Sequence, residues 1–188
     1  MNLHYSQYFV ALEADFASTA RFVEPAASNM CCHSLEFARL LLAAGSEIDV
    51  LCKVLCNRHG LVLTSENING YREALTSKFP GFTKLQVQMP RYNLVRLPWQ
   101  SWEKNTTPEW WRAYNSIKHE RHSTFTSANM SNALDAMAGL FVAVCYVCHG
   151  EIRARTALPW PQMLTLDPQL SSDIRTNLRP GHVLPDFQ

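Results

Sequence analysis

The sequence predicts an all-α protein, a bundle of about five mostly antiparallel helices. Apolar residues recur at intervals of three and four in about five segments, which is the period of one helix face. Proline, glycine or clustered serine and threonine separate these segments and provide helix stops. Only residues 82–100 depart from the helical period, so we expect a small β-hairpin or loop insertion there.

The first two predicted helices cover residues 3–23 and 28–58. The first carries an apolar line that begins at Tyr5, and Pro25 stops it. The second is longer, has a broad apolar surface and is followed by Gly60, a residue typical of helix ends.

The insertion follows a third predicted helix, residues 66–79, which ends at a Pro-Gly pair. Residues 84–89 alternate apolar and polar side chains, and after a turn residues 94–99 return as a second strand. Because an isolated hairpin is only marginally stable, we expect it to lie against the helices. The alternative is an irregular loop, which Pro90 and Pro98 would also suit.

Two more helices complete the predicted bundle. The fourth runs over residues 108–122, with Thr107 as N-cap and Pro108 in the first helical position. The fifth, residues 129–151, is apolar nearly all round in its second half. We expect it at the centre of the bundle or at an interface between two copies.

Prolines crowd the C-terminal part, residues 156–188, and predict an extended tail with at most a short helix near residues 171–178. The tail should wrap the bundle, because it would otherwise expose a run of apolar side chains. A chain of 188 residues fits one domain with its own core. We therefore expect a single domain, residues 1–188, with a helical core over residues 3–151.

Composition excludes several classes of function. The net charge is +1, so a general nucleic-acid coat or a membrane-surface binder is not indicated. The charged fraction is 18% and the hydrophobic fraction 47%, which is typical of a globular chain. Neither an uninterrupted apolar run of about 18 residues nor a secretion signal is present, so we expect a cytoplasmic protein without a membrane partner.

The six cysteines are expected to be free thiols packed in the core. They occur as Cys31 with Cys32, Cys52 with Cys56, and Cys145 with Cys148. The last pair precedes His149 with the C-x-x-C-H spacing of haem attachment, but it ends an apolar helix instead of lying in an open loop. A structural zinc site built from the last two pairs and His59 stays open as the alternative.

Several catalytic motifs are missing. The seven glycines are scattered singly, so no phosphate-binding loop forms, and no G-x-S-x-G elbow occurs. The run from His119 to His122 is one residue short of H-E-x-x-H. Nucleotide hydrolysis, serine esterase chemistry and zinc proteolysis are therefore not supported.

One stripe of polar residues on the fourth predicted helix remains. Arg112, Asn115, His119 and His122 fall at i, i+3, i+7 and i+10, along one side of that helix. A guanidinium, an amide and two imidazoles on one face form a candidate surface for binding an anion or transferring a proton.

Glu47 interrupts the apolar strip of the second predicted helix. Its neighbours at three and four residues on both sides are Ala43, Ala44, Val50 and Leu51. An unpaired charge there is costly, so Glu47 needs a basic partner, and the cations of the fourth helix are the candidates. The alternative is a side chain that reaches the edge of the bundle.

The residues around the stripe resemble a known family. Residues 110–121 read WWRAYNSIKHER and follow a long helix that carries Ser-Glu-Ile-Asp at positions 46–49. This combination resembles HEPN proteins, the higher eukaryote and prokaryote nucleotide-binding all-α superfamily, whose members carry an Arg and, a few residues later, a His on a late helix. Arg112 and His119, with six residues between them, match that pattern.

The resemblance implies a homodimer that is often a metal-independent endoribonuclease of a toxin, phage-defence or RNA-processing system and needs no cofactor. RNA cleavage without a metal requires a base, an acid and a cation at the phosphate. His119 and Arg112 are the implied catalytic residues, and two copies would supply two of each. The implied supporting or RNA-binding residues are Asn115, Lys118, Arg121, His122 and Glu47.

A non-catalytic reading is the alternative. The chain departs from the active members at Ala113, where they usually carry a polar residue. Arg112 would then only pair with Glu109 on the surface, while Asn115 and His119 would form hydrogen bonds inside the bundle. On this reading the protein is a helical dimer module that binds a nucleotide or a protein, for example an antitoxin.

Overall fold

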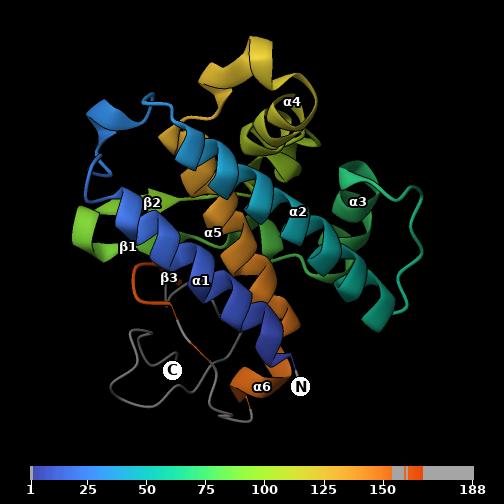
Figure 1. Cartoon of the computed structure of the whole chain (residues 1–188). Coiled ribbons are helices and arrows are strands. Elements are labelled where there is room, and N and C mark those ends of the chain that lie inside the picture. Colours follow the sequence, from blue (N-terminus) through green and yellow to red (C-terminus); the bar gives the residue numbers. More distant parts are fainter. Residues whose placement is uncertain (1, 154–158, 160, 167–188) are drawn as a thin grey trace.

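The computed structural model describes residues 2–153, 159 and 161–166 and shows a mostly helical chain with a small sheet (Figure 1). The described part contains six α-helices and three strands. The helices are α1 Leu3–Thr19, α2 Leu35–Arg58, α3 Ile68–Lys78, α4 Glu109–Thr124, α5 Met130–Val147 and α6 His149–Arg153, and the strands are β1 Val87–Met89, β2 Leu94–Arg96 and β3 Thr165–Leu166. The predicted helical class and the hairpin are confirmed.

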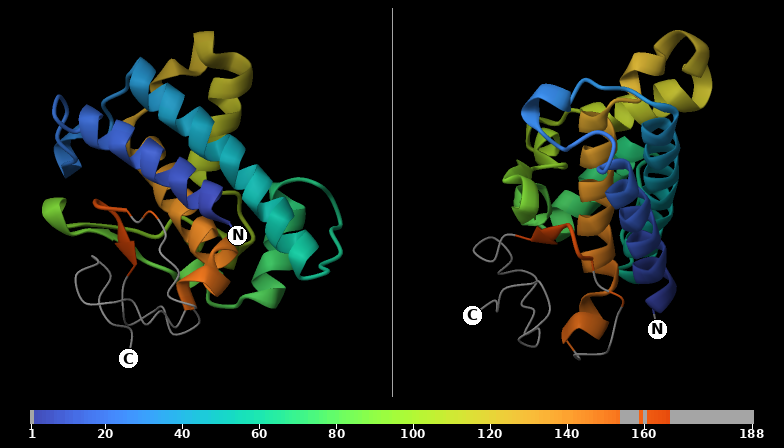
Figure 2. Two further views of the ribbon diagram at one scale, coloured as in Figure 1. Left: turned by 60° about the horizontal axis from the view of Figure 1, so that its bottom comes forward. Right: turned by 60° about the vertical axis from the view of Figure 1, so that its left-hand side comes forward.

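Helix α5 lies at the centre, with α1 and α2 on one side and α4 near its first turns (Figures 1 and 2). Every side chain from Ala136 to Val147 is buried, because other elements surround this part of the helix. Phe141 stacks on Phe9 of α1 with 5.2 Å between ring centroids. At Gly139 an added Cβ would lie 3.2 Å from the Trp110 ring, so the missing side chain lets α4 approach closely.

The same helix is long and apolar enough to cross a membrane by length and composition. In this fold 89% of it is buried against the rest of the chain, as the core helix of a globular protein is. The length and apolar composition of α5 therefore do not indicate a membrane-spanning segment.

Two predicted helix starts are wrong, and only the first of them is set by a side-chain cap. The second predicted helix starts at Leu35 and not near residue 28, since the Ser34 hydroxyl accepts the backbone N–H of Phe37 at 3.1 Å. The fourth starts at Glu109 with Pro108 in the N-cap position, and the expected Thr107 cap is absent. Both positions suit their residues, since serine is a preferred cap and proline has no N–H to satisfy.

Two predicted helix ends also differ. The first helix stops at Thr19 and continues as turns, short of the predicted residue 23. The fifth predicted helix is two helices, because the backbone leaves helical geometry at Cys148 with φ −91° and ψ 9°. The described chain therefore has one α-helix more than expected, the short α6.

The insertion is an antiparallel hairpin in which Val87 pairs with Arg96 and Met89 with Leu94. As expected, it lies against the helices. The Arg96 guanidinium donates to both carboxylate oxygens of Asp135 on α5, at 2.5 and 2.6 Å, and to the hydroxyl of Ser131 at 2.7 Å. Burial raises the pKa of Asp135, against the opposite effect of Arg96.

A segment near the C-terminus adds the third strand, which no sequence pattern predicted. Strand β3 pairs antiparallel with β1, so the strand order is β2-β1-β3. Glu13 of α1 fixes the residues just before β3. Its buried carboxylate accepts hydrogen bonds from the backbone N–H groups of Gln162, Met163 and Leu164 at 2.7 to 2.9 Å. The short helix predicted near residues 171–178 lies outside the described residues.

Candidate functional site

Helix α4 has one buried and one exposed face, and the exposed face carries the stripe predicted from the sequence. The buried side chains are Trp110, Trp111, Ala113, Tyr114 and Ile117. They pack against α2 and α5. The exposed side chains include Arg112, Lys118, His119, Arg121 and His122.

Two close contacts fix α4 in place. The Trp110 indole N–H donates to the carbonyl of Pro98 at 2.8 Å and lies edge-on to Trp99. Further along, Tyr114 packs directly on Gly45 of α2, where an added Cβ would lie 2.5 Å from the Tyr114 ring. The exposed face of α4 is thus carried by a rigid support.

Arg112 lies on the surface and pairs with Glu109, one turn earlier on the same helix. The Arg112 and Glu109 side chains are 58% and 70% exposed. Such exposed pairs contribute little to stability, so solvent or a ligand can replace Glu109 as the partner. Arg112 and His119 lie seven residues apart, which is roughly 10 Å along a helix.

His119 lines an open hollow beside α2 that we call the basic hollow. Its volume is about 600 Å³, and it is lined by Leu42, Ile117, Lys118, His119, Arg121 and His122. Two of these side chains, Lys118 and Arg121, are cations, and two are imidazoles. None of the described residues that line this hollow carries a carboxylate, so its chemistry suits an anion such as a phosphate.

The helix changes direction inside this cluster. The backbone leaves helical geometry at Glu120, with φ −136° and ψ 36°, between His119 and Arg121. The hydroxyls of Ser123 and Thr124 donate to the freed Glu120 carbonyl at 3.1 and 2.9 Å. The break therefore separates the last turn, with Arg121 and His122, from the regular part of α4.

Asn115 opens onto a different hollow from His119. This second hollow lies between α2, the start of α3 and α4, has a volume of about 430 Å³, and includes Asn115 and Lys118 in its lining. Lys118 lines both hollows. The single helical stripe seen in the sequence is thus divided between two depressions.

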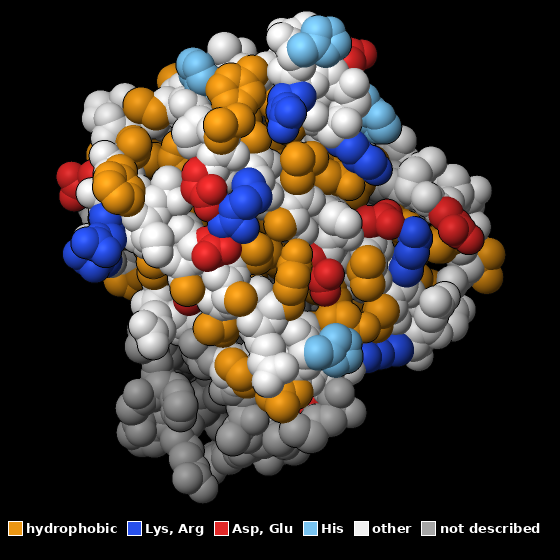
Figure 3. All heavy atoms as spheres, in the orientation of Figure 1, with side chains coloured by type: hydrophobic (Ala, Val, Ile, Leu, Met, Phe, Trp, Pro, Cys, Tyr) orange, Lys and Arg blue, Asp and Glu red, His pale blue; other side chains and the backbone are white. Residues whose placement is uncertain are grey.

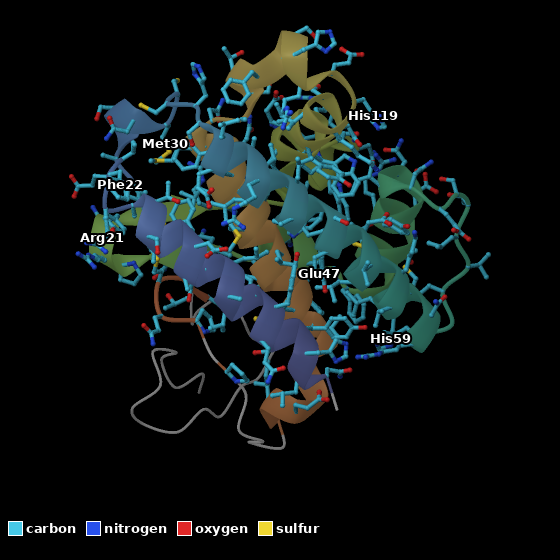
Figure 4. All side chains as sticks on the ribbon, in the orientation of Figure 1. Arg21, Phe22, Met30, Glu47, His59 and His119 are labelled. Atoms are coloured by element: carbon cyan, nitrogen blue, oxygen red, sulfur yellow. The ribbon has the colours of Figure 1, made fainter. Side chains whose placement is uncertain are left out.

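The expected pairing of Glu47 with α4 is wrong. Gly45 faces Tyr114 of α4, and Glu47 lies two residues further, about 200° around the helix. Its half-buried side chain is therefore on the α1 side of α2, away from His119 (Figure 4). Burial raises the pKa of Glu47, and nearby His4 of α1 acts in the opposite direction.

The cysteine prediction is partly wrong. Cys52, Cys56, Cys145 and Cys148 are buried, but Cys31 and Cys32 are exposed. Burial raises the pKa of the Cys148 thiol to about 12 and raises that of Cys145 well above its usual value. The described residues contain no cluster of three or more His, Cys, Asp or Glu side chains that could hold a metal ion.

Taken together, these features define a helical protein with a small sheet and one exposed basic helix face. In Figure 3, Lys, Arg and His side chains gather over α4 at the upper edge of the molecule. Comparisons of the chain with protein-family models, with curated proteins and with solved structures find no match.

Proposed function

We propose that this chain is a HEPN-like endoribonuclease that works without a metal ion as a homodimer. The observation that carries the proposal is the basic hollow, where His119 lies beside Lys118 and Arg121 and no carboxylate competes for the phosphate. The mostly antiparallel arrangement expected of the helices belongs to the same proposal. Most of the predicted C-terminal tail, residues 156–188, lies outside the described residues.

The chemistry follows from the groups present. An imidazole of His119 takes the proton of the RNA 2′-hydroxyl, and the 2′-oxygen attacks the adjacent phosphorus. A second imidazole gives a proton to the departing 5′-oxygen, which leaves a 2′,3′-cyclic phosphate and a 5′-hydroxyl. The guanidinium of Arg112 offsets the negative charge that builds up on the phosphorane oxygens.

A dimer solves a geometric problem in this mechanism. Within one chain, the backbone positions of Arg112 and His119 are roughly 10 Å apart along α4. Arg112 is paired with Glu109, which lies one turn further from His119. Two copies of α4 that run antiparallel about a two-fold axis would place Arg112 of each copy beside His119 of the other. Both side chains are exposed, so a second copy can reach them once Arg112 exchanges its partner Glu109.

The biological setting is part of the proposal. The enzyme would act in the cytoplasm in a toxin, phage-defence or RNA-processing system. In a toxin system a protein antitoxin would cover the basic hollow or prevent the two chains from pairing, because either contact would remove the composite site.

Two observations favour a second candidate function, a non-catalytic dimer module that binds a nucleotide or protein partner. Ala113 is only 3% exposed and faces the core, so this position cannot present a polar group to a substrate. Arg112 already has Glu109 as a partner. On this reading the basic hollow binds an anionic partner and leaves it unchanged.

The test is RNA cleavage in excess chelator. Structured and single-stranded RNA are incubated with the wild type, His119→Ala and Arg112→Ala. We expect each variant to lose about a hundredfold or more of the rate, which is the usual contribution of an acid, a base or an oxyanion-stabilising group.

Two matched variants serve as controls, His59→Ala and Arg21→Ala. Both side chains are exposed and lie away from His119 (Figure 4), so these variants should cleave as the wild type does. Equal cleavage by all five proteins would contradict the nuclease proposal. Binding of RNA or nucleotide without cleavage by the wild type would favour the second candidate.

A further inference from the structure

The second hollow, which we call the polar hollow, has a lining unlike that of the basic hollow. It combines two carboxylates, Asp49 and Glu66, with the amide of Asn115 and the ammonium of Lys118. Trp111 and Tyr114 also line it, but each is only 6% exposed. Hydrogen-bond acceptors and donors thus meet in one depression of about 430 Å³.

Asp49 is fixed and neutralised by its neighbours. One of its oxygens accepts the hydroxyl of buried Tyr71 at 3.1 Å, and the other accepts Lys53 Nζ at 2.8 Å. The charge of Asp49 is therefore balanced inside the protein. The groups left for a ligand are the remaining lone pairs of Asp49 and the side chains of Glu66, Asn115 and Lys118.

Glu66 and Asn115 have their full hydrogen-bonding capacity available. Among the described residues, no hydrogen bond or ion pair engages the Glu66 carboxylate or the Asn115 amide, and Glu66 is exposed. Lys118 is placed by Tyr114, since its Nζ lies 5.6 Å from the centre of that ring. The carboxylates of Asp49 and Glu66 are balanced by Lys118 and by nearby Lys53, whose pKa both carboxylates raise. The polar hollow therefore has no excess positive charge to attract a phosphate.

We infer that the polar hollow binds a guanine base of single-stranded RNA. Guanine presents a ring N–H and an exocyclic amino group side by side on its Watson–Crick edge, and a carboxylate such as Glu66 can accept both. Its O6 and N7 acceptors suit the donors of Asn115 and Lys118. Unstacked RNA bases are commonly recognised by hydrogen bonds to these edges.

The other bases fit this set of groups less well. Adenine and cytosine each place an acceptor beside their amino group, which would face the Glu66 carboxylate, and uracil has a single ring donor between two carbonyls. A lysine or arginine from a partner protein would pair with Glu66 but would leave Asn115 and Lys118 without acceptors. Guanine is the ligand that satisfies all three side chains.

The inference rests on the proposed function and adds the base that the enzyme recognises. Lys118 lines both hollows, so a guanosine held in the polar hollow would direct its phosphate past Lys118 toward the basic hollow. The wall that separates the two hollows is α4 itself, with Asn115 on one side and His119 on the other. Cleavage should therefore occur next to guanosine.

The test uses binding of free nucleosides, which carry no phosphate and so do not depend on the basic hollow. Guanosine, adenosine, cytidine and uridine are titrated by calorimetry into the wild type, Glu66→Gln and Glu24→Gln. Glu24 is an exposed acid after α1, and its variant removes the same charge at a distance from the hollow.

We expect the wild type and Glu24→Gln to bind guanosine at least about tenfold more tightly than the other nucleosides, and Glu66→Gln to lose about tenfold in guanosine affinity. Equal binding of the four nucleosides, no binding, or guanosine binding that Glu66→Gln leaves unchanged overturns the inference. Binding of an oligolysine peptide in place of guanosine also overturns it and favours a basic protein partner.

The readout separates this inference from the proposed function. If the wild type does not cleave RNA but binds guanosine through Glu66, the nuclease proposal fails and the guanine site stands. If the wild type cleaves RNA without preference for guanosine and binds no nucleoside, the guanine site fails and the nuclease proposal stands.

Discussion

Helices α4 and α5 pack against each other but differ in what surrounds them. The side chains of α5 are buried on all sides over its second half, while α4 buries one face and exposes the other. The residues expected to stabilise the fold therefore lie mainly on α5, and those of the proposed site lie on α4. Groups that bind substrates must reach solvent, so α4 can carry a site on its exposed face, whereas α5 can only support it.

The strongest way to test this separation is a cavity in α5. Leu140 is fully buried, so Leu140→Ala should lower the free energy of unfolding by about 2–5 kcal/mol. Lys118→Ala and Arg121→Ala, on exposed positions of α4, should stay within about 0.5 kcal/mol of the wild type. Urea denaturation measures all three. A comparable loss of stability in the α4 variants would show that the exposed face also supports the fold.

A smaller effect is expected where the buried face of α4 meets α2. A Cβ at Gly45 would lie 2.5 Å from the Tyr114 ring, so Gly45→Ala should cost about 1–3 kcal/mol and displace Tyr114. Since Tyr114 lines the polar hollow, guanosine affinity should fall as well. Gly150→Ala is the control, because nothing lies within 4 Å of an added Cβ there. Unchanged stability in Gly45→Ala would mean that α4 can move away from α2 freely.

The smallest predicted effect on stability concerns Glu47, which lies on α2 and belongs to neither α4 nor α5. Burial raises its pKa in the folded chain, so the fold favours the protonated form. That contribution to stability is fully present below the pKa of the unfolded chain, about 4.3, and is lost as pH rises through the folded pKa. Glu47→Gln should therefore be more stable than the wild type at pH 7, with the difference vanishing near pH 4.

Thermal unfolding at several pH values measures this difference, with Glu24→Gln as the exposed control. A difference that is the same at pH 4 and pH 7 would show that the effect comes from packing and not from the charge of Glu47.

Short-range patterns explain the successful predictions. The apolar periods of the α3 and α5 regions and the alternation around Val87 depend on neighbours in the chain, so their elements were recognised. The start of the second predicted helix was wrong because the Ser34 cap, and not the apolar period, sets where α2 begins. The placement of Asn115 differed because a helical stripe indicates a shared face but not which neighbouring element divides it.

The sequence alone determined the helical class, the hairpin and the exposed cationic stripe of α4, because period and residue type are local properties. Only the tertiary structure decided which surfaces meet. It placed Glu47 against α1, turned Ala113 into the core, used Glu13 to hold the segment before β3, and separated Asn115 from His119. Each of these depends on contacts between residues far apart in the chain, which no local pattern specifies.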